Sequence, residues 1–555
     1  MRKLIVANLM LVFLLAGCTQ KQESQKTKPN ILIIVGDDLG FSDIGPFGGN
    51  IQTPVLDAFS KEAVLFSNFH VLPTCSPSRS ALLTGNDNHI AGFGIMSELD
   101  YPAVHNLPGY SGYLSDQVTT IPEVLNINGY HTYMTGKWHL GEGAGKDPHD
   151  RGFEQTFILG TGGGSHWADR KPLAPPQSMD YTRNGKGVEP PQDFYSTRNY
   201  TDSMIQFIER NKSDNKPFFG FLSYTAVHDP LHAPAEYIAK YKGKFSMGWD
   251  SLAMMRVRRL IELGIVPEGV KALPNPMIPK WESLSKEHQE DFARDMEVYA
   301  AMLEYMDMSI GRVIDFLKQS GMYENTMIIF MSDNGANGAV ATSYPGNADG
   351  KYLSSFENKM ENRGMLGSYI ETGPGWAQAS SAPFRLFKSF TTEGGIKAPL
   401  MVKMPGHSKN AGQWNKEFIH VTDVMPTLLE LAGAAYPEER SGKKLHPLIG
   451  KSMLSILNGD ASSIHNNEGM GWELFEMKAF VKGNYKILRL PIPFATGQWQ
   501  LYDLEKDPGE TTDISGKFPE IRDALIKDWN DYAKRNELFD HKGHYDSIYR
   551  AAFSR

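Results

Sequence analysis

Short apolar runs alternate with longer segments of helical periodicity along the chain, up to about residue 434. The runs end abruptly at polar or glycine residues and lie at 31–35, 131–134, 218–224 and 327–331. Short, apolar runs rich in β-forming residues are typical of buried parallel strands. Apolar residues at helical spacing lie between and after them, at 116–128, 200–212, 289–320 and 423–432. This alternation predicts a doubly wound α/β domain.

The pattern changes after about residue 440. Residues 479–491 and 498–504 alternate and are rich in β-forming side chains, and 519–535 has helical spacing. We expect a smaller C-terminal domain with an antiparallel sheet and one helix. The chain of 555 residues also exceeds the roughly 250–300 residues that one hydrophobic core serves. We therefore divide it into a large domain at 30–434 and a C-terminal subdomain at 435–555.

Composition narrows the class of protein. Hydrophobic residues make up 41% and charged residues 22%, which excludes wholesale disorder and a multi-span membrane protein. The 56 Lys and Arg against 64 Asp and Glu give a net charge of −8, so nucleic acid is not an expected partner. Two cysteines in the whole chain exclude a disulfide scaffold, and each cysteine needs its own explanation.

The first cysteine belongs to an export signal. Two basic residues precede an apolar run at 4–15, which is too short to cross a bilayer core about 30 Å thick as a helix. The run ends in the sequence LAGC, whose last residue is Cys18, and this resembles the bacterial lipoprotein signal. The resemblance implies removal of residues 1–17, a lipid on Cys18 and a polar tether at 18–29. We expect an exported protein, lipid-anchored in the outer membrane or periplasm of a bacterium.

The second cysteine opens the segment Cys75-Ser76-Pro77-Ser78-Arg79. Pro77 and Ser78 suit the first turn of a helix, which places Cys75 at a helix N-terminus, where backbone N–H groups favour an anion. Arg79 adds a bidentate donor for a tetrahedral oxyanion. The alternative interpretation is a buried cysteine beside a capped helix. The pattern Cys-X-Pro-Ser-Arg, followed by Leu-Thr-Gly, resembles the signature of type I sulfatases of the alkaline phosphatase superfamily.

This resemblance implies a fold and a chemistry. The family fold is a large α/β/α catalytic domain with a mixed central sheet, plus a smaller C-terminal domain. The cysteine is oxidised after synthesis to formylglycine by a maturation enzyme, which assigns that modification to Cys75. One hydroxyl of the hydrated aldehyde attacks sulfur, and the other then loses its proton and expels sulfate. The family therefore hydrolyses sulfate monoesters to an alcohol and inorganic sulfate.

Polar pairs follow two of the apolar runs. Asp37-Asp38 follows 31–35 after one glycine, and Asp333-Asn334 follows 327–331 after one serine. Sites in open α/β sheets form outside the carboxyl ends of strands, and these oxygen donors suit a hard divalent cation. Taken alone, Asp37-Asp38 also fits a turn. The family resemblance makes Asp37, Asp38, Asp333 and Asn334 ligands of one calcium ion, together with the residue derived from Cys75. Magnesium is the alternative ion.

Three further segments resemble the active-site motifs of the family. The sequence GKWH implies that Lys137 contacts sulfate and that His139 takes the proton of the second hydroxyl. His228 follows the run at 218–224 and is implied as the acid that protonates the leaving oxygen. The third segment, at 383–399, implies that Lys388 contacts a sulfate oxygen. Arg385 and Lys397 lie in the same segment and are the alternatives for this role. The predicted catalytic set is Cys75, Arg79, Lys137, His139, His228 and Lys388.

The substrate is predicted less directly. Segments 85–89 and 383–388 resemble the branch of sulfatases that includes bacterial arylsulfatases. Together with export, this favours an exo-acting carbohydrate sulfatase on a galactose-type sugar, with arylsulfatase-type activity. The candidate substrate contacts are Asn88, His89, His232 and Trp376. Trp167 and Tyr369 are further loop aromatics, and each loop aromatic has the alternative of packing inward. The rival functions are a phosphonate monoester or phosphodiester hydrolase of the same superfamily, and a non-catalytic glycan-binding lipoprotein.

Overall fold

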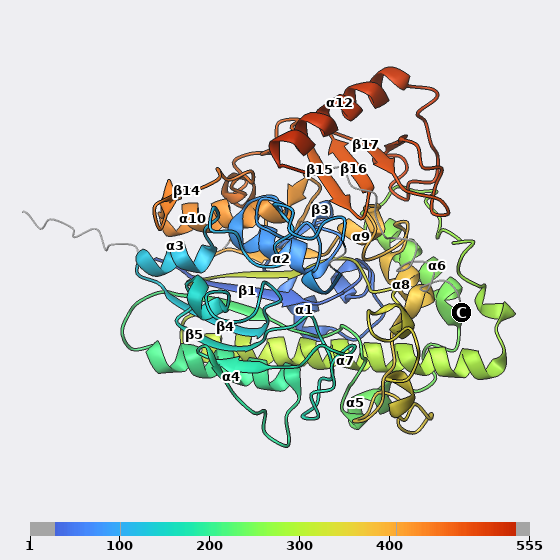
Figure 1. The fold of residues 1–555 in the computed structure, drawn as a ribbon, viewed down its shortest axis with the longest axis horizontal. Coiled ribbons are helices and arrows are strands. Elements are labelled where there is room, and N and C mark those ends of the chain that lie inside the picture. The colour runs from blue at the N-terminus through green and yellow to red at the C-terminus, as the bar shows by residue number, and fades with distance from the viewer. Residues whose placement is uncertain (1–27, 100–101, 407, 540–555) are drawn as a thin grey trace, which may run out of the picture.

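The large domain is built on a ten-stranded mixed sheet. The structure, a computed structural model, describes residues 28–99, 102–406 and 408–539 (Figure 1). The strand order is β11-β2-β10-β9-β1-β8-β4-β5-β6-β7. In chain order these strands are β1 (Asn30–Gly36), β2 (Val64–Phe66), β4 (His131–Lys137), β5 (Gln155–Leu159), β6 (Tyr181–Arg183), β7 (Lys186–Gly187), β8 (Phe218–Ser223), β9 (Thr326–Ser332), β10 (Leu400–Lys403) and β11 (Trp414–Asn415).

The central strands run parallel, which brings their carboxyl ends to one edge. β1 pairs in parallel with β8 through Ile31 and Phe219, and with β9 through Ile31 and Met327. β4 extends the parallel set beside β8, whereas β10 lies antiparallel to β9. Every residue of β1, β8 and β9 is buried, as expected for strands covered on both faces. The prediction of a doubly wound α/β domain is confirmed.

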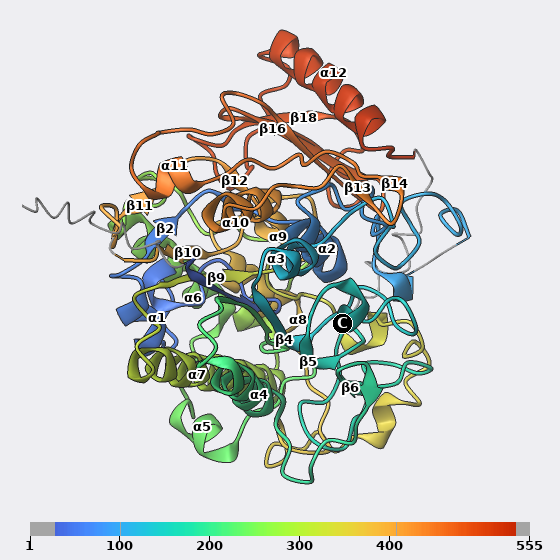
Figure 2. The ribbon, with the colours of Figure 1, turned by 90° about the vertical axis from the view of Figure 1, so that its left-hand side faces the viewer.

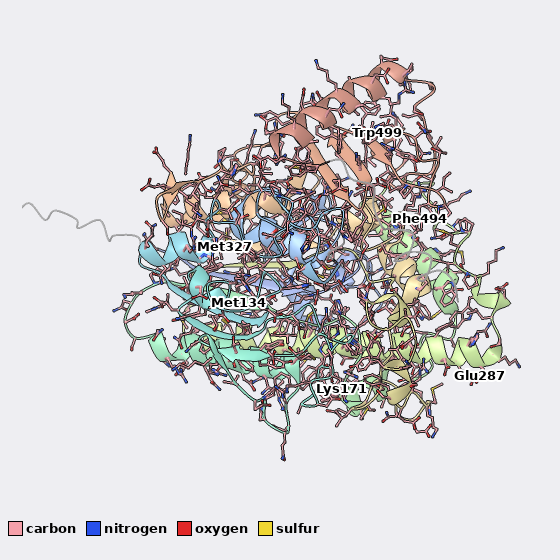
Figure 3. All side chains as sticks on the ribbon, viewed as in Figure 1. Met134, Lys171, Glu287, Met327, Phe494 and Trp499 are labelled. Carbon is pink, nitrogen blue, oxygen red and sulfur yellow. The ribbon has the colours of Figure 1, made fainter. Side chains whose placement is uncertain are left out.

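Helices cover both faces of the sheet. In Figures 1 and 2, α4 and α7 lie on one face, while α2, α3 and α10 lie on the other, below the C-terminal sheet. Figure 3 labels Met134 on β4 and Met327 on β9, which are both buried in this layered core. The helices of the large domain are α1 (Pro54–Phe59), α2 (Cys75–Thr84), α3 (Ile121–Ile127), α4 (Ser196–Asn211), α5 (Ala235–Lys240), α6 (Gly248–Glu262), α7 (Lys286–Gln319), α8 (Gly373–Ser381), α9 (Glu393–Ile396) and α10 (Val424–Ala432).

Helix ends differ from the sequence prediction where a cap decides them. The predicted helix at 116–128 begins only at Ile121, because Thr120 and Glu123 form a reciprocal capping box. The long helix begins earlier than predicted, at Lys286, because the Ser285 side chain accepts a hydrogen bond from the His288 N–H. The Gly- and Pro-rich stretches also hold elements that their sequences do not reveal: β5 to β7 in 141–193, and α8 in 335–385.

The C-terminal part forms the predicted antiparallel sheet and helix. The sheet has the order β15-β16-β17-β18. Its elements are β15 (Met470–Leu474), β16 (Met477–Lys482), β17 (Tyr485–Arg489), β18 (Gln500–Asp503) and α12 (Pro519–Arg535). Trp472 of β15 is fully buried, and its indole N–H donates to the Val71 carbonyl of the large domain at 2.9 Å. The two parts thus share one interior. Among the described residues, no helix combines the length and apolar character needed to span a membrane.

Candidate active site

The predicted metal ligands meet at the carboxyl edge of the parallel strands. Asp37 and Asp38 follow β1, and Asp333 and Asn334 follow β9; all are buried. The Asp38 backbone adopts a left-handed conformation, with φ of 62°, and its N–H donates to Asp333 Oδ1 at 3.2 Å. Parallel pairing of β1 and β9 therefore brings residues almost 300 positions apart into direct contact.

Cys75 reaches the same point from a buried helix. It is the first residue of α2, every residue of which is buried. Ser78 fixes the entry into this helix, because its hydroxyl accepts from the Leu72 N–H at 2.9 Å and donates to the Leu72 carbonyl. The Cys75 sulfur lies 3.5 Å from Asp37 Oδ1 and 3.7 Å from Asp38 Oδ1. Burial raises the pKa of the Cys75 thiol well above its usual range, so the unmodified residue is a protonated thiol.

Each carboxylate of the cluster has its own nearest cation, and Arg79 also lies 3.5 Å from Asp37 Oδ1. Arg79 donates through Nε to Asp333 Oδ2 at 2.9 Å, and Lys137 Nζ lies 2.8 Å from Asp37 Oδ2. Lys388 Nζ lies 2.8 Å from the Asp38 carboxylate. All three cations are buried. When all three carboxylates are ionised, the three cations balance their charge.

Burial and pairing act in opposite directions on the carboxyl groups. Burial raises the pKa of Asp37 to about 7, against the effect of Lys137. Burial also opposes ionisation of Asp38, but Lys388 and His228 hold the pKa of that carboxyl below its ordinary value. Arg79 does the same for Asp333. Removal from water therefore disfavours the ionised form of each carboxyl group, and the close cations oppose this effect.

The ligand set fits a divalent cation. Asp37, Asp38, Cys75 and Asp333 each offer a donor atom within 4.8 Å of the others. The Asn334 amide donates to Asp38 Oδ1 at 2.7 Å, whereas its buried Oδ1 has no hydrogen-bond partner among the described residues. An oxygen-rich set with an unused amide oxygen suits a hard cation such as calcium. A divalent ion would give the charge-balanced cluster a positive charge, which an anionic sulfate ester would complement.

His228 is held beside the metal ligands. Its Nδ1 lies 2.7 Å from the Asp229 carbonyl oxygen, which only accepts, so Nδ1 carries the proton. Its Nε2 lies 3.4 Å from Asp38 Oδ2. Burial lowers the pKa of His228 to about 3, so the ring is neutral. The nitrogen nearer the cluster is therefore the one that can exchange a proton.

His139 has a partner that the sequence did not reveal. Its Nε2 lies 3.0 and 3.1 Å from the two carboxylate oxygens of Glu98. Burial lowers the pKa of His139, although Glu98 acts against this. The buried Nδ1 of His139 has no partner among the described residues. Glu98 lies in a short 3-10 helix, Ser97–Leu99, outside the recognised motifs, and nothing in its local sequence indicates this contact.

A small cavity of about 60 Å³ opens beside Cys75. His139, His228 and Lys388 also line it, and so do Glu98 and the polar residues Gln177, Asn337 and Tyr344. The cavity is thus continuous with the predicted catalytic set. Gln177, Asn337 and Tyr344 come from long loops, in the stretches 141–193 and 335–385.

Two rivals of Lys388 are occupied elsewhere. Arg385 donates to the Phe494 carbonyl oxygen. Lys397 Nζ lies 3.4 Å from the Glu393 carboxylate. Of the three basic candidates in this segment, Lys388 is the one whose ammonium contacts the acidic cluster.

The structure places two of the candidate substrate contacts away from the cavity, beneath the C-terminal part. Asn88 donates to the Phe93 carbonyl at 2.8 Å, within its own loop. His89 is buried between Asp87, at 3.0 Å, and Glu473 of β15, at 3.2 Å. Their polar atoms are used inside the protein, so this geometry does not present them to a sugar.

The other candidate contacts are also packed inward. His232 Nε2 lies 3.0 Å from the Ser368 carbonyl oxygen, and its ring is buried. The Trp376 indole donates to the Phe292 carbonyl, and its ring packs against Trp249. The other loop aromatics do the same: Trp167 stands 4.7 Å from the Tyr195 ring, and the Tyr369 hydroxyl donates to the Leu173 carbonyl. These aromatics anchor loops in this structure.

Known proteins resemble this chain over most of its length. A family model described as "Sulfatase" matches residues 29–434, and one described as "N-sulphoglucosamine sulphohydrolase, C-terminal" matches 384–535. An uncharacterized sulfatase of Schizosaccharomyces pombe is 41% identical, over 92% of this chain and 94% of that protein. An arylsulfatase of Klebsiella aerogenes is 39% identical, over 78% of this chain and 93% of that protein.

The fold has a solved counterpart. The crystal structure of Ps i-CgsB superposes with a TM-score of 0.65 at 24% identity, covering 95% of this chain and 97% of that one. At this identity the likeness concerns the fold. The match of the family model to most of the chain, and the identity to full-length relatives, establish the assignment itself. The chain belongs to the sulfatase family and is a sulfuric ester hydrolase.

Proposed function

We propose that the protein hydrolyses sulfate monoesters through a formylglycine made from Cys75, with one calcium ion bound beside it. The observation that carries this proposal is the meeting of Cys75, three carboxylates and three cations at one buried edge of the sheet, next to a cavity. Asp37, Asp38, Asp333 and Asn334 would hold the ion. When bound, calcium supplies a positive charge that polarises a sulfate oxygen and favours an ionised nucleophile. The oxidised Cys75 supplies the nucleophilic hydroxyl.

The remaining residues bind, orient and move protons. Arg79, Lys137 and Lys388 stabilise negative charge on the sulfate oxygens, and their burial strengthens each interaction. His228 acts at Nε2, since its Nδ1–H is engaged with the Asp229 carbonyl. The free ring is neutral, so Nε2 must first take up a proton when the anionic ester binds, and it then passes that proton to the leaving oxygen. His139 accepts the proton of the second hydroxyl through Nδ1, because Nε2–H is held by Glu98.

We propose carbohydrate sulfates as the natural substrates, cleaved from a terminal sugar, with aryl sulfates as artificial ones. The cavity beside Cys75 has a mainly neutral wall, and Gln177 on that wall offers hydrogen bonds to sugar hydroxyls. The arylsulfatase relative and the sugar sulphohydrolase description of the C-terminal family model support the same class. A galactose-type sugar remains a prediction from the sequence.

A substrate panel tests the proposed function. The protein, with oxidation of Cys75 verified by peptide mass, is assayed for sulfate release from positional isomers of galactose sulfate and glucosamine sulfate, and from an aryl sulfate. Release from one sugar isomer far above the others would support the proposal and name the hydroxyl. A bis-aryl phosphodiester serves as the rival substrate, and turnover of that compound alone would overturn the sulfate assignment. Binding of sulfated sugars without release would indicate a non-catalytic protein.

We also propose that the protein is an exported lipoprotein. Cys18 and the signal at 1–17 lie outside the described residues, so this rests on the sequence pattern alone. Labelled palmitate fed to expressing bacteria should appear on the wild-type protein and be absent from Cys18→Ser. Equal labelling of the two would contradict the anchor. Formation of formylglycine also requires a maturation enzyme that oxidises Cys75. In cells that lack this enzyme, the mass of the Cys75 peptide should be that of the unmodified cysteine.

A further inference from the structure

The wall of the cavity carries one acidic residue among the described residues that line it. Besides Glu98, the polar part of the wall is neutral, with Gln177, Asn337 and Tyr344, and Met96 and Leu173 add apolar surface. The basic residues His228 and Lys388 lie at the sulfate end, where both face Asp38. Lys388 is paired with Asp38, so the Glu98 carboxylate has no cation of its own among the other described residues that line the cavity.

Glu98 is fixed in this position by His139. Both of its carboxylate oxygens lie about 3 Å from His139 Nε2, while the side chain keeps 19% of its surface exposed. Burial opposes ionisation of Glu98, but the hydrogen bond from His139 favours the carboxylate and lowers its pKa below the ordinary value. The His139 ring is itself neutral, because burial lowers its pKa and because Lys137 and Arg79 are further cations close to it. The pair therefore has a net charge of −1, and the hydrogen bond orients the carboxylate without cancelling it.

Gly162 leaves the space that the side chains of His139 and Glu98 occupy. A Cβ atom at Gly162 would lie 2.8 Å from His139 Cε1 and 3.0 Å from Glu98 Oε1. Because real Cβ atoms essentially never approach so closely, the chain is shaped around the two side chains. Glu98 thus has a defined place on the wall of the cavity that Cys75 also lines.

We propose that Glu98 is a specificity-determining residue, which restricts the enzyme to sulfate esters whose alcohol carries no second anion beside the sulfate. The proposal rests on the sulfatase function proposed above. Neutral sugars and uncharged aryl alcohols meet a carboxylate that accepts hydrogen bonds from hydroxyl or amide groups. A uronate, or a sugar with a neighbouring second sulfate, carries a second anion. The Glu98 carboxylate repels this anion in a partly desolvated site, and the repulsion selects against such substrates.

Two aryl sulfates of matched shape test this. 3-Carbamoylphenyl sulfate and 3-carboxyphenyl sulfate differ in one neutral or anionic group. We expect wild-type kcat/KM to favour the carbamoyl ester by about tenfold or more. Glu98→Gln is expected to reduce this ratio to within about threefold, even though loss of the His139 contact lowers both rates. The ratio is compared between variants, so the different intrinsic reactivity of the two esters cancels.

Controls separate the possible failures. Glu142→Gln removes a carboxylate that acts on Glu98 through space but does not line the cavity, and it should keep the wild-type ratio. Should Glu98→Gln not fold, the wild-type ratio must fall with rising salt, since screening weakens the repulsion. An unchanged ratio in Glu98→Gln, or a salt-independent ratio, would overturn the inference. Absence of sulfate release from both esters by the wild-type protein with oxidised Cys75 would instead contradict the proposed function.

Discussion

At the scale of single residues, the site is a set of charges that are stable only together. Asp37, Asp38 and Asp333 are fully desolvated, and each depends on one buried cation. The residues at the ends of β1, β4 and β9 were predictable from sequence, because a polar pair or a lysine closely follows an apolar run. Glu98 was not predictable, since only folding brings it to His139 from 41 positions away. Trp376 packs inward, which is the alternative to a substrate contact that its sequence also allows.

The unused oxygen of Asn334 leads to a prediction about metal binding. Asn334→Ala removes that oxygen and should weaken calcium binding at least about tenfold. Titration calorimetry of the purified protein measures the affinity directly, and the rise in thermal midpoint on adding calcium should shrink in the variant. Equal affinity in the two proteins would remove Asn334 from the ligand set.

Gly162 gives a prediction about the position of His139. Gly162→Ala places a methyl group within about 3 Å of the His139 and Glu98 side chains, so the pair must shift. We expect kcat/KM to fall about 10- to 100-fold, because small misplacements of catalytic groups are costly. Gly187→Ala is the control, since a Cβ there meets nothing within 4 Å. Full activity of Gly162→Ala, with calcium binding intact, would show that His139 tolerates displacement.

At the scale of elements, caps and close pairings determine what periodicity alone does not. The helix Pro519–Arg535 has the bounds that its spacing predicts, and Gly433 ends α10 in a left-handed conformation, with φ of 62°. The start of α3 was predicted wrongly, because the Thr120 capping box overrides the polar turn before it. The short strands β5 to β7, at one end of the sheet, lie in a glycine-rich stretch and carry too little alternation to be recognised.

His89 connects the segment after α2 to strand β15 and makes this contact pH-dependent. Its hydrogen bonds to Asp87 and Glu473 outweigh burial and raise the pKa of His89 to about 9. The stabilisation is therefore complete below the unfolded pKa, about 6.5, and is lost as pH rises through 9. Denaturant unfolding should show wild type more stable than His89→Gln at low pH, with the difference shrinking from pH 6.5 to 9. A difference that grew over this window would contradict the assigned ion pairs.

At the scale of the whole molecule, the C-terminal part is joined to the catalytic edge by a buried charge network. Lys486 of β17 contacts Glu393 at 2.9 Å and Glu510 at 2.7 Å. Glu393 also contacts His70, at 3.0 Å. All of these groups are buried. Glu393 thus ties the segment that follows Lys388 to the second sheet. Sequence reasoning found both domains but not this network, because its members come from distant segments without a shared motif.

Removing the central cation of this network should destabilise the whole protein. Lys486→Met leaves Glu393 and Glu510 buried without their main partner, and we expect a loss of about 3–5 kcal/mol in the free energy of unfolding. Lys506→Met is the matched control, since its pair with Asp503 lies on the surface with the lysine 79% exposed, and it should change stability very little. Similar unfolding midpoints for the two variants would show that the network contributes no stability.

The most direct test of the account concerns Cys75 itself. Sulfate release from an aryl sulfate is measured for the wild-type protein, with the Cys75 peptide shown by mass to carry the aldehyde, and for Cys75→Ala. The account predicts that turnover follows the oxidised fraction of the wild type and is abolished in Cys75→Ala, while calcium binding and the thermal midpoint are largely retained. Turnover by Cys75→Ala at the wild-type rate would contradict the assignment of Cys75 as the nucleophile.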